Sequence, residues 1–591
     1  MWSRPVRRLL TRHFLQRFLE NDLISPDTDR HEVLSTASAI LISSGLFVTI
    51  LLGVKYLGPF QTPGRTAVDV LDDRFFYIAC AMIIMALVAL AEWDALGLDA
   101  RDTSILGPLP INRGDIVRAK LAAVAIFAAG FGLALNLMPS LLFSWLVVAK
   151  LRVGLLEPIT LAAAQAAICL AAGAFGFLSV LGLRELLHAI FGTWWSTRVA
   201  TVVQACLVVF LGTVLLLTPS LSSDVAGVWL GSGASSPFAV PPLWFLGLHE
   251  RLAGSVIIGL PRDELPAQIL RSETEATALY RSHERLFQEL GYVAIAALLT
   301  VAVVALGAFV WNSRRLPVAP SSRRSKRGRV SDTCRWVVQR LVVRHLEAQA
   351  GFFFTLQCLS RSLPHRIGMS MFVAIGFAAA AVSLVGTDYW HLQNVTSLPL
   401  KFFVIQPVLV TALLVGFRYV VGVPAEPRAN WAFHLSWSGD ERPYLAGVKR
   451  AAVVGLVLPT LWVLFPLHAM MLGFRLAIAH LLCGMLISLV LLEGLLLGFR
   501  KLPFASSHVP SVNMKTLGPI YLLGAFLALY GLAWLERLAL GSPFGTLAFL
   551  IGSTTVLGVL RAIDMWQRRI RVPIELDELP PPATQRLGLS G

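Results

Sequence analysis

The sequence predicts an all-α, polytopic integral membrane protein with about twelve transmembrane helices in two six-helix halves. The chain of 591 residues is 56% hydrophobic and 14% charged, with a mean hydropathy of +0.70. A soluble protein carries roughly a quarter charged residues. Apolar runs of about 20 residues, the length at which an α-helix crosses a bilayer, recur along the whole sequence. Outer-membrane barrels instead show short alternating strands, a pattern that this sequence lacks.

A basic segment separates the apolar runs into two sets of six. This segment, reading SRRLPVAPSSRRSKRGRV from Ser313, is rich in Pro, Ser and Arg and is unsuited to forming a core. We therefore expect a first unit at 1–316, a basic cytosolic linker at 317–341 and a second unit at 342–591. The predicted spans are 33–57, 75–93, 121–149, 159–183, 199–219, 291–311, 367–385, 402–423, 451–474, 477–499, 518–535 and 544–565.

Lys and Arg gather in three segments, and these set the expected orientation. The segments are the N-terminal region, the linker and the C-terminal end, with six predicted spans between one and the next. Because cytoplasmic loops carry the excess of Lys and Arg, we expect all three segments, and both termini, to be cytosolic. The same rule accounts for the net charge of +15, so nucleic acid is not an expected partner. The basic residues include Arg4, Arg7, Arg8, Arg12, Arg17, Arg323, Arg324, Lys326, Arg327, Arg329, Arg561, Arg568, Arg569 and Arg571.

Two kinds of segment are predicted to lie at the membrane surface. Residues 2–22 read as a basic amphipathic helix on the inner leaflet, and residues 342–361 are its counterpart in the second half. The long segment 220–290 is predicted to be external. Within it, Pro241-Pro242 is expected to start an amphipathic helix at the outer interface. This external segment is either a structural cap over the spans or a gate for substrate release.

The sequence lacks the motifs of common catalytic sites. There is no GxxxxGK[ST] phosphate loop, so the chain itself is not expected to bind ATP. GxSxG, HExxH and metal-ligand Cys/His spacings are also missing, and we expect neither enzyme activity nor a cofactor or metal. Glu493 is an acid inside a predicted span. It would serve either as a proton relay or, the interpretation we favour, as a structural group that pairs with Arg500 or Lys501 or extends to the inner interface.

Two polar insertions occupy matching places in the two halves, each between apolar runs. The first, 98–120, reads LDARDTSILGPLPINRGDIVRAK, and the second, 428–450, reads RANWAFHLSWSGDERPYLAGVKR. Aligning them pairs Arg113 with Arg442 and Lys120 with Lys449, and the next apolar run follows at once in both. This favours a parallel internal repeat, an arrangement found in transporters.

The first insertion also resembles a known family. Leu106, Leu109, Pro110, Asn112, Arg113 and Lys120 occupy the places of a short interfacial helix, a Leu-Pro pair, polar and basic residues and a span-opening Lys in type-2 ATP-binding-cassette (ABC) exporter permeases. The resemblance implies six spans per unit, a cytosolic ATP-binding subunit that docks on this loop, and an exported substrate. The second insertion lacks the Leu-Pro pair, so an equal contact there does not follow.

The leading hypothesis is the membrane-spanning permease component of an ATP-driven exporter in a bacterial inner membrane, formed by two fused units and possible as a homodimer. The alternatives are a secondary carrier with parallel repeats or a membrane enzyme acting on lipid-linked substrates, for which Asp72-Asp73 would supply paired acids. Expected partners are the ATP-binding subunit and membrane lipid. The predicted coupling residues are Asp99, Arg101, Asp102, Leu109, Pro110, Arg113, Asp115 and Lys120, with Trp431, Arg442 and Lys449 in a second coupling loop.

Overall fold

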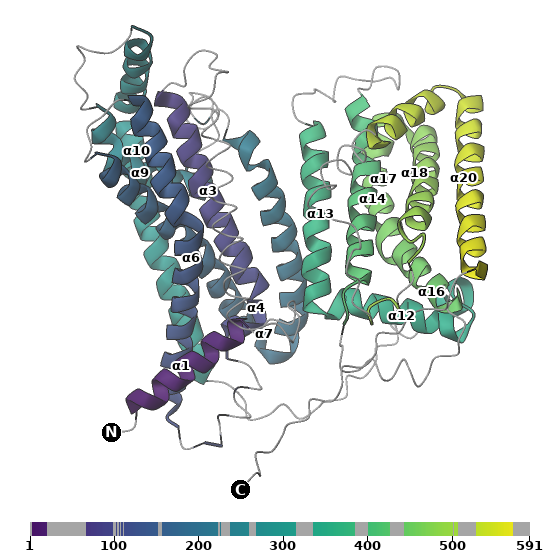
Figure 1. Cartoon of the computed structure of the whole chain (residues 1–591), viewed down its shortest axis with the longest axis horizontal. Helices are drawn as coiled ribbons and strands as arrows, with labels where there is room; N and C mark the ends of the chain where they lie inside the picture. Colours follow the sequence, from purple (N-terminus) through teal and green to yellow (C-terminus); the bar gives the residue numbers. More distant parts are fainter. Residues whose placement is uncertain are drawn as a thin grey trace. The chain divides into compact units, whose positions relative to one another are not determined.

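The protein is described from a computed structural model (Figure 1). The described residues are 3–19, 67–98, 102, 106, 108–109, 111–151, 157–222, 225, 237–258, 267–314, 335–384, 400–425, 442–499, 502–505 and 528–570. Among them the regular structure is entirely helical, with no strand. The chain divides into two compact units, Met1–Arg323 and Arg324–Gly591. This division falls within 317–341, where the sequence suggests a linker.

Ten described helices are long and apolar enough to cross a membrane. They coincide with ten of the twelve predicted spans, which establishes a multi-pass α-helical membrane protein. The predicted span at 33–57 lies outside the described residues, as does most of the one at 518–535. Residues 528–540, at the end of the latter, are helical.

Unit 1 is built around its longest helix, α7. Its elements are α1 (Ser3–Leu19), α3 (Ala67–Ala91), α4 (Trp93–Leu96), α6 (Arg113–Leu151), α7 (Glu157–Leu221), the 3-10 turn η1 (Pro237–Ala239), α9 (Pro241–Ile258) and α10 (Ala267–Arg314). Helices α3, α6 and α10 all pack against α7. A continuous helix of 65 residues would measure roughly 98 Å if it were straight. Leu161 near its start and Leu215 near its end instead belong to the same core cluster, so α7 doubles back between two membrane-length arms.

Helix α9 is packed into unit 1 and does not simply rest on a surface. It begins at Pro241, where the Pro pair predicts a helix start, and it contacts α10, α7 and α3. Leu243, Phe245 and Leu246 on α9 are at most 1% exposed. The charged stretch that precedes the last span of the unit forms one continuous helix with it, α10.

Unit 2 repeats some of this arrangement with shorter elements. These are the π-helical turn η3 (Val338–Val342), α12 (Leu346–Arg361), α13 (Leu363–Leu384), α14 (Leu400–Val421), α16 (Arg442–Ala452), the π-helical turn η6 (Val453–Val457), α17 (Leu458–Leu472), α18 (Phe474–Leu495) and α20 (Pro543–Ile570). Helices α16, η6 and α17 follow one another without a break, so η6 interrupts the third span of this unit.

In each unit, a helix lies across the base of the span that follows the polar insertion. In unit 1, α1 lies obliquely across α6, and in unit 2, α12 packs on α16 (Figure 1). Two glycines permit the close approach in unit 2. A Cβ at Gly447 would lie 2.0 Å from the carbonyl oxygen of Ala348, and one at Gly351 would lie 2.3 Å from that of Tyr444. The shared pairing agrees with the internal repeat that the two polar insertions suggest.

Candidate functional site

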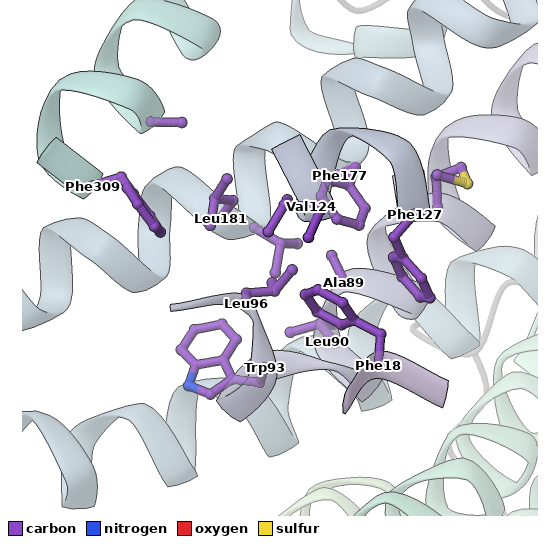
Figure 2. Packing of buried hydrophobic residues seen from close by; sticks show 14 of the residues in the cluster. Phe18, Ala89, Leu90, Trp93, Leu96, Val124, Phe127, Phe177, Leu181 and Phe309 are labelled. Carbon is purple, nitrogen blue, oxygen red and sulfur yellow. The ribbon is translucent and has the colours of Figure 1, made fainter. Parts of the chain in front are cut away.

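The predicted coupling residues of the first half surround the α1 end of unit 1. Six helices meet there in one hydrophobic cluster (Figure 2). Phe18 comes from α1, Leu90 from α3, Trp93 from α4, Phe127 from α6, Leu181 from α7 and Phe309 from α10, and all six are buried. A displacement of any one of these helices is therefore felt by the other five, because buried side chains are close-packed.

Lys120 fixes α1 to the base of α6. Its side chain is fully buried, and its ammonium nitrogen lies 4.8 Å from the centre of the Phe14 ring and 4.9 Å from that of Phe18. Such a cation–π contact gains strength when water is excluded. Lys120, one of the predicted coupling residues, is thus inaccessible to a docking protein and acts inside the unit.

The start of α6 explains why the loop ends at Arg113. The Asn112 side-chain oxygen accepts a hydrogen bond from the Gly114 backbone N–H at 3.1 Å, which caps the helix. Asp115 lies in the first turn, where a negative charge favours the helix dipole, and forms an ion pair of 3.5 Å with Arg118. Arg113 is exposed at this tip.

The remaining predicted residues of this loop are placed as follows. Leu109 is 47% exposed and forms part of a turn in which its N–H donates to the Leu106 carbonyl at 3.2 Å. Asp102 is buried at 6% exposure, so it faces the unit. Asp99, Arg101 and Pro110 lie outside the described residues. The accessible part of the predicted surface therefore centres on Leu109 and Arg113, with Asp115 partly covered.

Gly97, the residue just before the first polar insertion, lies against the polar side chain of Arg184 on α7. A Cβ at Gly97 would lie 2.0 Å from a guanidinium nitrogen of Arg184, so a larger residue here would have to displace that side chain. Arg184 is paired with Glu185, and the Asn312 side chain donates to both the carbonyl and the carboxylate of Glu185 at 2.7 Å. The loop is thereby in contact with α7 and, through Glu185, with the end of α10.

The second predicted coupling loop is only partly described. Trp431 lies outside the described residues, and Arg442 is exposed at the start of α16. Lys449 points into unit 2. Its ammonium lies 2.5 Å from Glu493 and 3.4 Å from Asp564, which joins α16 to α18 and α20.

Glu493 has partners that the sequence does not predict. Arg500 and Lys501, the partners predicted for it, both lie outside the described residues. In the structure the two Glu493 oxygens contact Lys449 and Arg561, at 2.5 and 3.2 Å. Residues 44 and 68 positions away were beyond the reach of a local argument. Glu493 is thus neutralised by two cations, as the structural interpretation of this acid requires.

Sequence reasoning also missed a buried ion pair at the other end of unit 1. Arg74 of α3 donates to Glu250 of α9 at 2.7 Å, with both side chains 1% exposed. His249, fully buried, lies 3.3 Å from the same carboxylate. The preceding Asp72 accepts a hydrogen bond from the Val225 backbone N–H at 2.9 Å. The pair of Arg74 with Glu250 anchors α3 to α9, and Asp72 anchors α3 to Val225. In the sequence, only the neighbouring acids Asp72 and Asp73 indicated a polar group in this region.

A second polar cluster that the sequence did not reveal lies in unit 2. His480 of α18 contacts Glu536 at 2.6 Å, and both are fully buried. Within the described ranges, no group of three or more His, Cys, Asp or Glu side chains has the geometry to hold a metal ion.

Comparison with known proteins adds no relative to this description. No family model, curated protein or solved structure matches the chain.

Proposed function

We propose that this chain is the membrane-spanning permease component of an ATP-driven exporter of the ABC type. It works with a separate cytosolic ATPase subunit in a bacterial inner membrane and moves substrate out of the cytosol. The observation that carries the proposal is the exposed tip formed by Leu109 and Arg113. This tip is continuous with α6, a helix of 39 residues that is long enough to cross the bilayer.

The mechanism follows from how that tip is supported. A partner that grips Leu109 and Arg113 applies force at the end of α6. The contact of Lys120 with α1 fixes the helix base, so a push on the tip tilts α6 against α7. The contacts of Gly97 with Arg184 and of Glu185 with Asn312 carry the same motion to the ends of α7 and α10. Alternating access then arises from tilting of packed spans.

Unit 2 supports a weaker or different coupling. Arg442 is exposed at the start of α16, whereas Lys449 is committed to Glu493 and Asp564. The second contact therefore involves fewer of the predicted residues than the first. We propose that the ATPase acts mainly on unit 1 and that unit 2 follows.

The alternatives have less support. A secondary carrier driven by Glu493 would need that acid to gain and lose charge, yet two cations neutralise it. A membrane enzyme using Asp72 would need a free carboxylate, yet an Asp72 oxygen accepts the Val225 N–H. Neither acid is arranged as a reactive group.

Purification in mild detergent tests the proposal. The chain, tagged and expressed in its native host, is expected to recover a protein with a phosphate loop, and the complex should hydrolyse ATP. The same chain expressed without the tag is the control for proteins that bind the resin directly. Recovery without any ATPase, under conditions in which a known ABC exporter of the same membrane stays intact, would refute it.

A further inference from the structure

A short segment at the start of unit 2 exposes arginines together with large apolar side chains. We call this set the basic-apolar face, and its members are Arg335, Trp336, Arg340, Leu341, Arg344 and Leu346. The three apolar side chains are 60%, 72% and 81% exposed in chain order, and the three arginines are exposed as well. Large apolar side chains gathered on one surface mark a place that another molecule covers.

The other side of the same segment is packed against the unit. Val338 and Val342 contact a small core cluster that includes Val343, Phe352 and Ala451. Residues four apart lie on one face of a helix, so this packed pair fixes how the segment is turned. The exposure of the basic-apolar face is therefore a consequence of a defined packing and not of a loose end.

The segment lies at the level where the membrane-length helices of unit 2 begin. Arg450 of α16 donates to the Val342 carbonyl at 2.8 Å, and an apolar run starts at the next residue, Ala451. Helix α12 lies across the base of α16, and the single residue Ser362 separates its end from the span α13 (Figure 1). The basic-apolar face is thus placed at a boundary between membrane and water.

The chemistry of the face suits such a boundary. The guanidinium carbon of Arg340 lies 5.8 Å from the centre of the Trp336 ring, and that of Arg335 lies 5.3 Å from the Phe353 ring. Trp side chains are enriched among lipid headgroups, and exposed leucines beside them can enter the upper acyl region. A guanidinium group binds the oxygens of a phosphate with two parallel hydrogen bonds.

The charge of the segment selects anionic lipid. From Arg335 to Leu346 the sequence contains three arginines and no acid, and the exposed Arg450 adds a fourth cation beside it. Each cation near an anionic membrane surface strengthens attachment about fivefold. A protein partner would need an acidic surface at the same level, where lipid headgroups already present phosphate.

We propose that the basic-apolar face binds the anionic phospholipids of the membrane surface on the α12 side. The arginines bind phosphate oxygens of the headgroups, while Trp336, Leu341 and Leu346 enter the upper acyl region. This attachment holds the start of unit 2 at the membrane surface. The inference is independent of the exporter proposal, since the contact needs neither an ATPase nor a transported substrate.

Fluorescence quenching on the full chain tests this surface. A fluorescent amino acid replaces Leu341, and single chains are placed in nanodiscs of phosphatidylcholine brominated in the upper acyl chain, with or without about 30% phosphatidylglycerol. Quenching should be stronger with phosphatidylglycerol, and added salt should remove this difference because it screens the charges. Nanodiscs of unbrominated lipid give the fluorescence without a quencher.

Charge reversal supplies the variants. Arg340→Glu combined with Arg344→Glu should reduce the phosphatidylglycerol-dependent quenching by about fivefold or more, whereas Lys at both positions should retain it. Arg251→Glu combined with Arg285→Glu is the matched control, because both are exposed cations of unit 1 and the net charge changes equally. Equal quenching in both lipid compositions, an equal loss in the control, or a probe shielded only after an ATPase subunit or a second chain is added would overturn the proposal.

Discussion

The buried ammonium of Lys120 lies 4.8 Å from the centre of the Phe14 ring, and this contact joins the base of α6 to α1. The centre of the Phe18 ring lies 4.9 Å from the same ammonium. A desolvated cation–π contact contributes up to about 2 kcal/mol. The position of α1 is thus coupled to a charge on the helix that it crosses.

Replacing Phe14 by Leu tests that coupling. The substitution keeps an apolar side chain but removes the ring face, so we expect a loss of roughly 1–2 kcal/mol and a lower melting temperature in detergent. The loss should shrink when Lys120 is already Met, because the cation is then absent. An equal loss in both backgrounds would mean that Phe14 contributes through packing alone. Phe131→Leu, on a ring that contacts Phe127, is the control.

Reversing the charge at the exposed tip tests the docking surface. Arg113→Glu should weaken recovery of the ATPase about tenfold, or about 1.4 kcal/mol, and the wild-type interaction should weaken with added salt. Arg285→Glu is the control, since Arg285 is exposed on α10 near the opposite end of unit 1. ATP hydrolysis and pull-down that are unchanged in Arg113→Glu would argue that the loop does not dock a partner.

The glycine crossing of α12 and α16 should tolerate no side chain. Gly447→Ala places a Cβ 2.0 Å from a backbone oxygen, so the two helices must separate at a cost of roughly 1–3 kcal/mol. Gly494→Ala serves as the control, because a Cβ there meets nothing within 4 Å. Thermal unfolding of the two variants should therefore differ, and similar melting temperatures would contradict the close approach.

Removing one partner of the Lys449–Glu493 pair should cost more than removing both. Lys449→Met leaves Glu493 with Arg561, whose side chain is 55% exposed, and we expect a loss on the order of 3 kcal/mol. Adding Glu493→Gln to this variant should restore part of the stability, as a melting curve in detergent would show. A double variant less stable than Lys449→Met would show that Glu493 has a further favourable partner.

Acid should destabilise unit 1 through His249, which lies on α9 and outside the ten candidate spans. Burial, and then the neighbouring Arg74, lower the pKa of His249 from its ordinary 6.5, although Glu250 opposes this. As pH falls below 6.5, the unfolded chain takes up a proton that the folded chain resists, so stability falls. His249→Gln should remove this slope in melting curves recorded against pH, whereas the exposed His13→Gln should keep it.

Composition and hydropathy predicted the helical membrane fold, because about 20 apolar residues must span a bilayer as a helix. They also located the tip at Leu109 and Arg113, since polar residues between apolar runs lie outside the membrane. The partners of buried charges were not predictable in this way. Arg74 meets Glu250 across 176 positions, and His480 meets Glu536 across 56. Such pairs depend on which helices pack together, and hydropathy does not specify that.

The π-helical turn η6 gives the two units different stiffness. Helix α6 is α-helical from Arg113 to Leu151, with Pro139 inside it, whereas the corresponding span of unit 2 passes through η6 between α16 and α17. A π-turn departs from the i→i−4 bonding of an α-helix and often marks a functional bend. The same force would therefore swing the part of α6 before Pro139 as one rod and bend the corresponding part of unit 2 at η6. A protein made of two similar halves would then transmit motion through one of them and absorb it in the other.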